Sequence, residues 1–98
     1  MRKPIKEILN ILRENLPQIT QVYKVKTLEI FGSYVRFEED EKSDVDILVS
    51  FYELPSLLRF IELEVYLSDK LGLNVDLVMK EALKKNIGEK ILREVVMV

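Results

Sequence analysis

The sequence predicts an α/β or α+β fold, in which helices pack against a small mixed β-sheet. Two observations support this prediction. Short apolar segments bounded by turn-forming residues are typical of strands, and longer segments with apolar residues three and four positions apart are typical of helices. The chain has 98 residues and contains no internal repeat or linker that would divide it. We therefore expect residues 1–98 to form a single domain around one core.

The first predicted helix covers residues 4–16. Pro4 fits its first turn, and Pro17 is expected to end it, because proline lacks a backbone N–H and clashes with the preceding turn. A second, longer helix is expected over residues 55–71, with Gly72 as its C-terminal cap. The apolar residues of the second helix cover more than one stripe, so part of its surface is left for the last helix or for a partner protein.

Strands are predicted at residues 25–31, 45–51 and 74–79, each rich in apolar residues. In the first strand, alternation is expected to place Val25 and Thr27 on one side, with Leu28 and Ile30 on the other; Glu29 is a further candidate for the side of Thr27. Residues 81–94 follow a helical pattern that contains one glycine, and residues 95–98 could form a short closing strand. The order of elements is then α-β-β-α-β-α with an optional last strand, which suits a small mixed sheet.

The composition excludes several classes of function. With no Cys and no His, the chain cannot form a disulfide, a thiolate zinc site or a Ser-His-Asp triad. Metal chemistry would depend on oxygen ligands, which favour Mg²⁺. A net charge of −2 argues against strong nucleic-acid binding by the whole surface. The apolar runs are too short to span a membrane and the first residues do not resemble a signal core, so we expect a cytoplasmic protein.

Three carboxylates stand out by their positions. Asp44 and Asp46 lie two residues apart at the start of a predicted strand, so their side chains leave the same face, and Asp76 lies within another apolar strand. An ionised carboxylate in such a setting is costly unless it is paired or bound to a metal. If the two strands are neighbours, a divalent cation would relieve the repulsion among the three. The alternative is that these residues serve only in turns or protect an edge strand.

Gly32 and Ser33 directly follow the first predicted strand. Glycine permits a tight turn and lets backbone N–H groups approach a phosphate closely, and the serine hydroxyl adds another donor. Taken alone, the pair would be explained better by an ordinary turn at the end of a strand.

The combination of these features resembles the nucleotidyltransferases of the DNA polymerase beta superfamily. Gly32-Ser33 is followed after ten residues by Asp44-Val45-Asp46, and later by the lone strand aspartate Asp76. Residues 31–36 (FGSYVR), 43–49 (SDVDILV) and 91–95 (ILREV) are similar to the small prokaryotic MNT, or minimal nucleotidyltransferase, branch. The resemblance therefore covers nearly the whole chain and implies the polymerase-beta type of nucleotidyltransferase core.

The resemblance implies a role for each matching residue. Asp44 and Asp46 would bind a Mg²⁺ ion that also bridges the triphosphate, and Asp76 would bind a second Mg²⁺ and orient or deprotonate the acceptor hydroxyl. Gly32 and Ser33 would hold the outer phosphates. The acceptor oxygen would then attack the α-phosphorus in line and displace pyrophosphate.

One departure from the branch lies in the following loop. Members commonly have Gly directly after the arginine that corresponds to Arg36, whereas Phe37 occupies that place here. A phosphate contact is the role expected of Arg36, but the departure leaves both the loop path and this role open.

The small size leads us to expect that another molecule brings the acceptor, since one or two helices after the strands are too little for a second domain. Within the MNT branch, the resemblance implies a partner of the HEPN family, a toxic RNase that is neutralised when AMP from ATP is attached to a tyrosine. The chain would then be a protein adenylyltransferase and an antitoxin. The alternative is a non-catalytic antitoxin that neutralises a HEPN partner by docking alone. An oligomer of this chain is compatible with either.

Other side chains near the motif have two interpretations. Lys80, Lys84 and Lys85 form a cluster that could hold the nucleotide or an acidic partner, although a solvated helix face is the commoner arrangement. Tyr34 and Tyr52 flank the motif and could line a base pocket, although half-buried core tyrosines are commoner.

Overall fold

The computed structural model describes residues 4–34, 44–82 and 94–98. These residues form a mixed α+β fold, as the sequence predicts. The elements in chain order are the helix α1 (Ile5–Tyr23), the strand β1 (Val25–Phe31), the 3₁₀ turn η1 (Gly32–Tyr34), the strand β2 (Val45–Phe51), the helix α2 (Leu57–Leu71), the strand β3 (Val75–Met79), the 3₁₀ turn η2 (Lys80–Ala82) and the strand β4 (Val96–Met97). Most of the predicted last helix (residues 81–94) lies outside the described residues.

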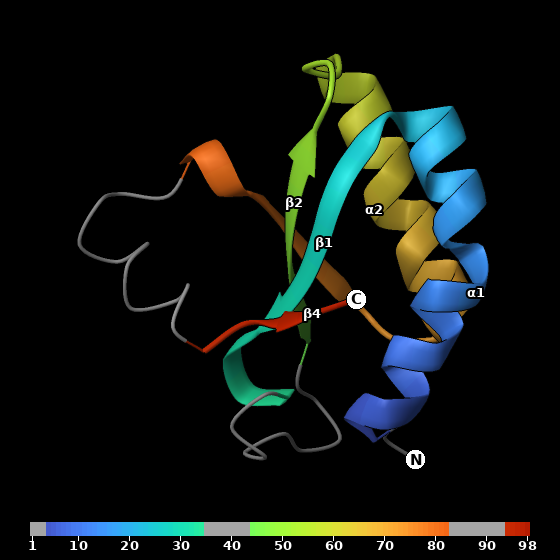
Figure 1. The fold of residues 1–98 in the computed structure, drawn as a ribbon, viewed down its shortest axis with the longest axis vertical. Coiled ribbons are helices and arrows are strands. Elements are labelled where there is room, and N and C mark those ends of the chain that lie inside the picture. The colour runs from blue at the N-terminus through green and yellow to red at the C-terminus, as the bar shows by residue number, and fades with distance from the viewer. Residues whose placement is uncertain (1–3, 35–43, 83–93) are drawn as a thin grey trace.

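The four strands form one sheet in the order β3-β2-β1-β4. β1 runs antiparallel to β2 and to β4, whereas β2 and β3 are parallel, so the sheet is mixed. The parallel pair is joined by α2, which makes the crossover that such a connection needs. Both helices lie side by side on the same face of the sheet (Figure 1). Neither helix lies on the opposite face, where the side chains of Glu29 and Leu48 are nevertheless buried.

The core lies between the two helices and the sheet. It is built from apolar residues that alternate along the strands and recur along the helices. Its members are Ile8, Leu12, Ile19, Val25, Leu28, Ile30, Tyr34, Val45, Ile47, Val49, Leu63, Leu67, Leu71, Val75 and Leu77.

The prediction that Pro17 ends the first helix is wrong, because α1 continues through it to Tyr23. Proline within a helix costs about 3 kcal/mol. The continuation buries Ile19 completely on the same side as Ile8 and Leu12. Full burial of an isoleucine side chain contributes about 1.5–3 kcal/mol, and Pro17 itself is exposed, so its ring meets no neighbouring element. Packing on the sheet thus offsets the local penalty.

The side assignment of Val25 is also wrong. A bulge between Val25 and Thr27 shifts the pairing of β1 with β2 by one residue. Such a bulge reverses the alternation locally, so Val25 joins Leu28 and Ile30 in the core.

The ends of α2 follow standard capping rules. Ser56 is the N-cap, and its hydroxyl accepts a hydrogen bond from the backbone N–H of Arg59 at 3.2 Å. Gly72 ends the helix in the left-handed conformation with φ +66°, as predicted from its position after the last apolar residue.

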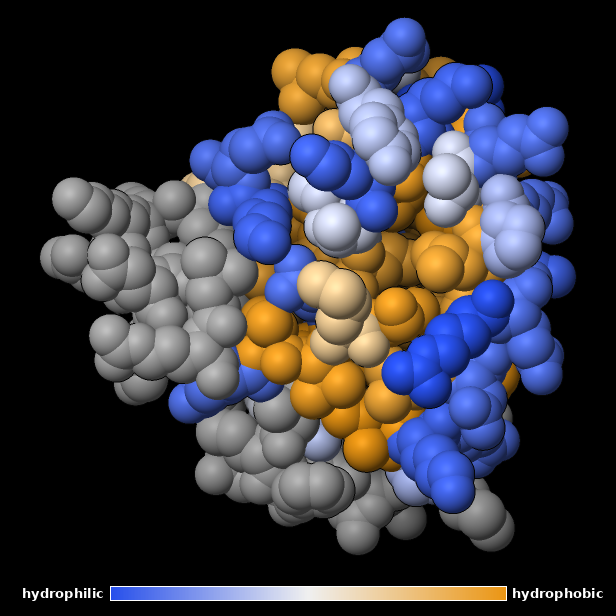
Figure 2. Space-filling model, viewed as in Figure 1, coloured by the Kyte–Doolittle hydropathy of each residue, from blue (hydrophilic) through white to orange (hydrophobic). Residues whose placement is uncertain are grey.

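The surface seen in Figure 2 is apolar around β4 and along the adjoining side of α1, while polar side chains cover the outer surface of α1. Met97 of β4 is 61% exposed. No helix within the described ranges has both the length and the apolar character needed to cross a membrane.

Candidate functional site

Two of the candidate carboxylates lie next to each other on adjacent strands. Asp46 of β2 and Asp76 of β3 are partners in the parallel register, so their side chains leave the same face of the sheet. This face is the one opposite the helices, because the residues that alternate with them, Ile47 and Leu77, belong to the core. Asp44 lies directly before β2. The strand register therefore gathers the acidic motif at one end of this face.

The desolvation cost expected for these carboxylates from their apolar neighbours in the sequence applies only in part. Asp44 and Asp76 are both exposed, and Asp46 is half-buried. An exposed carboxylate keeps most of its hydration, so no partner is needed to offset burial. The argument for a metal site therefore depends on the closeness of like charges, whose mutual repulsion a bound cation would relieve.

Gly32 lies against Asp46 and has a conformation that only glycine adopts easily. It begins the η1 turn directly after β1 with φ +81°. A Cβ atom at this position would overlap the carboxylate of Asp46. Glycine therefore brings the backbone of the η1 turn against one of the candidate metal ligands, which is the geometry needed if the turn is to hold a phosphate beside a metal.

We expect Gly32→Ala to destabilise the fold more than Gly72→Ala. Both glycines have positive φ, but a Cβ on Gly72 would meet nothing within 4 Å. Gly72→Ala, the control, should lower the free energy of unfolding by about 1 kcal/mol because of its conformation alone. Gly32→Ala should lower it by at least about 2 kcal/mol because it also displaces Asp46. Urea unfolding of both variants measures the difference. Equal costs would contradict the close contact.

The remaining predicted residues are placed only in part. The backbone of Ser33 lies in η1, next to Gly32. Arg36, Phe37, Lys84 and Lys85 lie outside the described residues, so their expected roles stay predictions. The described residues of the Gly-Ser and aspartate motifs nevertheless lie at the same end of the sheet, where β1 ends and both β2 and β3 begin.

The carboxylate oxygens of the site are of the type that binds a hard divalent cation. Carboxylate oxygens are ligands that Mg²⁺ prefers, and it is commonly held by one or two carboxylates together with substrate phosphates. Within the described ranges, no group of three acidic side chains is arranged to hold a metal ion without other ligands. The neighbouring Asp46 and Asp76 would thus share the ion with phosphate oxygens held at Gly32.

Sequence reasoning missed an ion pair on the same face, between a buried carboxylate and a partly exposed lysine. Glu29 of β1 is 3% exposed, and its Oε1 accepts a hydrogen bond from Nζ of Lys80 at 2.9 Å. Glu29 pairs with Leu48, which lies on the same face as Asp46 two residues further along β2. The pair joins η2 to β1 across the central strand. A solvated role for Lys80 is therefore wrong, and the signal was a glutamate between apolar residues in a strand.

Neither flanking tyrosine lines the candidate site. Tyr34 is 1% exposed and belongs to the core. Tyr52 is 69% exposed but follows the end of β2, opposite the end that carries Asp46. The core interpretation holds for Tyr34, and the base-pocket interpretation fails for Tyr52.

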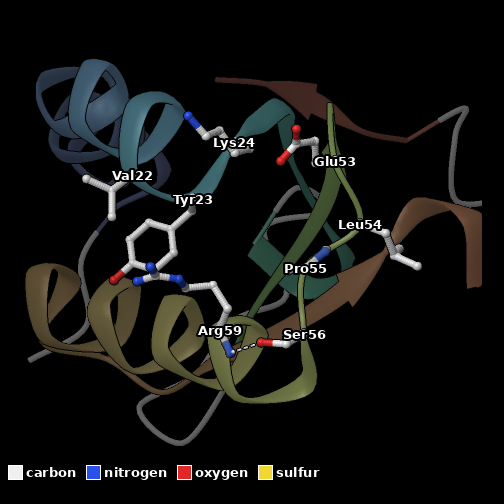
Figure 3. A pocket seen from close by; sticks show the side chains of 8 residues that line it. All are labelled: Val22, Tyr23, Lys24, Glu53, Leu54, Pro55, Ser56 and Arg59. Carbon is white, nitrogen blue, oxygen red and sulfur yellow. Dashed lines mark hydrogen bonds between the residues drawn. The ribbon is translucent and has the colours of Figure 1, made fainter.

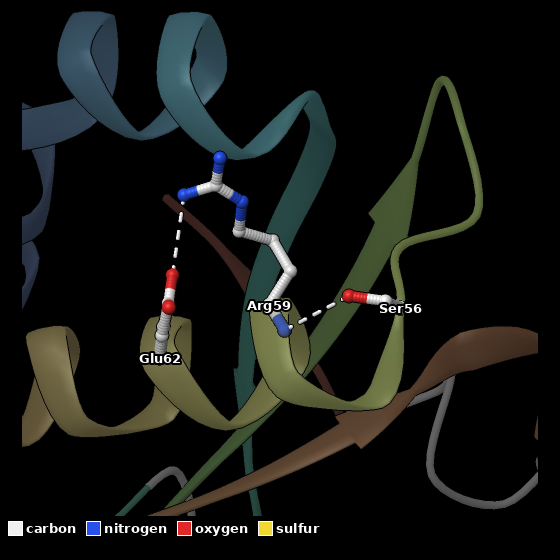
Figure 4. Close-up of polar contacts among 3 residues, drawn as sticks. All are labelled: Ser56, Arg59 and Glu62. Carbon is white, nitrogen blue, oxygen red and sulfur yellow. Dashed lines mark hydrogen bonds and ion pairs between the residues drawn. The ribbon is translucent and has the colours of Figure 1, made fainter.

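A cavity of about 260 Å³ lies at that opposite end of the sheet, between the end of α1 and the connection from β2 to α2 (Figure 3). The guanidinium of Arg59 points towards it and lies 5.8 Å from the ring centre of Tyr23. Arg59 is already paired with Glu62 at 3.1 Å (Figure 4). Burial, and then the Glu62 carboxylate, raises the pKa of Tyr23 above its ordinary value. The cavity is thus separate from the acidic site, and the charge of Arg59 beside it is neutralised by Glu62.

Comparisons with known proteins agree on one family. Residues 5–98 match the family model described as a nucleotidyltransferase domain. Protein adenylyltransferase MntA of Thermococcus cleftensis is 54% identical over 94 residues, which cover 96% of this chain and 95% of the relative. A solved structure of a protein assigned as a minimal nucleotidyltransferase has a TM-score of 0.79 at 34% identity and covers 94% of each chain. A toxin–antitoxin crystal structure with AMP-PNP has a TM-score of 0.68 at 25% identity, covering 94% of this chain and 69% of that chain.

Proposed function

The chain belongs to the nucleotidyltransferase family, in its minimal branch, and on this premise we propose that it transfers AMP from ATP to a tyrosine hydroxyl of a HEPN-family toxin, thereby acting as its antitoxin. One observation carries the proposal. Asp46, Asp76 and the Gly32 turn come together at the end of the sheet where β2 and β3 begin, and Asp44 and Asp76 are exposed there. The proposal places the reaction in the cytoplasm, where ATP is available.

Each residue has a task that follows from its place. Asp44 and Asp46 would bind a Mg²⁺ ion together with the triphosphate. The N–H groups of the turn at Gly32 and Ser33 hold the outer phosphates. Asp76, on the neighbouring strand, orients the acceptor hydroxyl. The acceptor oxygen forms a bond to the α-phosphorus as the bond to the bridging oxygen breaks. Pyrophosphate leaves, and the hydroxyl proton passes to Asp76 or to water.

The site needs little covalent chemistry from the protein. Phosphoryl-type transfer depends mainly on positioning and on stabilising charge, so the absence of His and Cys is no obstacle. When bound, two Mg²⁺ ions would stabilise charge on the attacking and leaving oxygens. Arg36 is retained in this proposal as a phosphate contact.

A toxin as the partner is supported by what the similar proteins are called. The relative from Thermococcus cleftensis is named MntA and protein adenylyltransferase, and the similar solved complex is a toxin–antitoxin pair with an ATP analogue. An acceptor on another protein also suits a site at an open end of the sheet, because Asp44 and Asp76 are exposed there.

The direct test uses labelled ATP, Mg²⁺ and the product of the gene beside this chain's gene, which the proposal expects to be a HEPN protein. We expect AMP to appear on a tyrosine of that protein, found by mass spectrometry, together with loss of its RNase activity. A labelled product on some other molecule, or none at all, would contradict the proposed acceptor.

A second candidate function is docking without transfer. It is favoured by an apolar patch on the outer side of α2, where Leu57, Leu58, Ile61 and Val65 are 75%, 68%, 46% and 53% exposed, respectively. Four large apolar side chains on one helix face are typical of a surface that binds a protein. This patch, called the α2 patch below, suits a catalytic antitoxin as well as a docking one.

We expect Leu58→Asp to weaken partner binding while leaving ATP binding unchanged. A charge at the centre of an apolar interface typically costs at least about 2 kcal/mol, or roughly 30-fold in Kd. Met97→Asp is the matched control, because Met97 is 61% exposed but lies on β4. Calorimetry of both variants with the HEPN protein and with ATP decides the matter. Equal weakening by the two variants would exclude the α2 patch.

A further inference from the structure

The third candidate carboxylate lies on an edge strand. β3 is at the end of the sheet order, so among the described residues only one of its sides pairs with a strand, namely β2. In a parallel pair, alternate residues direct their backbone groups to opposite sides. Asp76 is in register with Asp46, and its neighbours Val75 and Leu77 direct their N–H groups away from the sheet. Without partners, such groups leave an edge strand free to shift or fray.

Two side chains of α2 bind these outward N–H groups. Oε2 of Glu64 accepts a hydrogen bond from the N–H of Leu77 at 3.1 Å, and Oγ of Ser68 accepts one from the N–H of Val75 at 3.2 Å. The Ser68 hydroxyl in turn donates to the carbonyl oxygen of Glu64 at 2.9 Å. Asp76 is therefore the residue between two backbone groups that are both tied to the same helix.

We propose that Glu64 is a positioning residue that acts through the N–H of Leu77 to hold Asp76 beside Asp46. This inference rests on the proposed function, in which Asp76 orients the acceptor. Reactive groups must be held to within about 0.5 Å. β2 is a central strand paired on both sides, whereas β3 depends on α2 for its outer side. The carboxylate of Glu64 is half-buried against the strand, and its bond to an N–H is charge-assisted.

Three substitutions separate the hydrogen bond from the charge. Glu64→Gln keeps an oxygen acceptor at the same reach, Glu64→Asp keeps the charge but is one methylene too short, and Glu64→Ala removes both. Loss of a contact that supports a metal ligand typically lowers activity or metal affinity by about 10- to 100-fold. We expect kcat of the Asp and Ala variants to fall by that factor. Their KM for ATP should stay within about twofold of the wild-type value, because phosphate binding at Gly32 is unchanged. The Gln variant should stay within about threefold of wild type.

A second measurement requires no activity. Amide hydrogen exchange of the metal-free protein, followed by NMR, should show loss of protection at Leu77 in the Asp and Ala variants but not in the Gln variant. Glu62→Ala is the matched control, since Glu62 lies on the same helix in an exposed pair with Arg59, and it should change neither quantity. If the Ala variant fails to fold, the Asp variant carries the test.

The outcomes distinguish this inference from the function on which it rests. Wild-type transfer with unchanged kcat in the Asp and Ala variants, or a Gln variant as impaired as Ala, would overturn the positioning role and leave the proposed function intact. No transfer by the wild type would overturn the proposed function and the positioning role with it. Loss of kcat with rescue by Gln, matched by protection at Leu77, would support both.

Discussion

The double variant Asp44→Asn/Asp46→Asn is expected to lose AMP transfer by at least about 10³-fold, since bound metal contributes several kcal/mol of charge stabilisation. The same variant should lose the stabilisation that Mg²⁺ and ATP together give the wild type. A ligand at 100 times its Kd stabilises the folded state by about 2.7 kcal/mol, which for a domain of this size raises Tm by roughly 10 °C or more. Thermal unfolding with and without Mg²⁺ and ATP measures this shift.

The matched control for the double variant changes the same number of charges elsewhere. Glu53→Gln with Asp69→Asn removes two exposed carboxylates that lie outside the site. We expect this control to retain both transfer and the Tm shift. Without metal, the Asp44→Asn/Asp46→Asn variant should be at least as stable as the wild type, because it relieves repulsion among neighbouring carboxylates. A wild-type Tm shift in that variant would contradict the metal assignment.

The strands were predictable from the sequence because their signal is local. The predicted bounds of β1 and β2 agree with the structure, and β3 differs by one residue. The helix α1 was predicted too short because the argument from Pro17 is local, whereas the burial of Ile19 depends on the sheet. The bulge in β1 depends likewise on pairing with β2, which no residue pattern within β1 reveals.

The candidate carboxylates were found from residue type and spacing, but their geometry was not. Asp46 and Asp76 are 30 positions apart in the numbering, and only the parallel register of β2 and β3 makes them neighbours. The contact of Gly32 with Asp46 likewise requires the pairing of β1 with β2. The ion pair between Glu29 and Lys80 joins residues 51 positions apart. Such long-range contacts depend on how the chain folds back, which spacing along the sequence does not encode.

The helix α2 connects the two halves of the proposed function. One of its sides carries the exposed α2 patch, and another binds the edge strand that carries Asp76 through Glu64 and Ser68. A partner docked on the patch would therefore contact the helix that positions an acidic residue of the site. Docking and transfer use different groups of the same helix, so they can be separated by substitution.

Asp76→Asn is the substitution that separates binding from transfer most clearly. Asp76 is exposed, so loss of its charge should leave the fold and the Kd for the HEPN partner within about threefold of wild type. Transfer should fall by at least about 10²-fold, because the acceptor hydroxyl loses the group that orients it and helps take its proton. The measurements are pull-down or calorimetry for the complex and labelled ATP for transfer.

The matched control for Asp76→Asn is Asp69→Asn, which removes an exposed carboxylate of α2 outside the site and should leave transfer unchanged. Label on the partner at the wild-type rate from the Asp76→Asn protein would exclude a catalytic role for Asp76. A stable complex from which even the wild type transfers no AMP would favour the docking function instead. In that case the carboxylates at the open end of the sheet would have no part in neutralising the toxin, and Leu58→Asp would remain the variant that abolishes it.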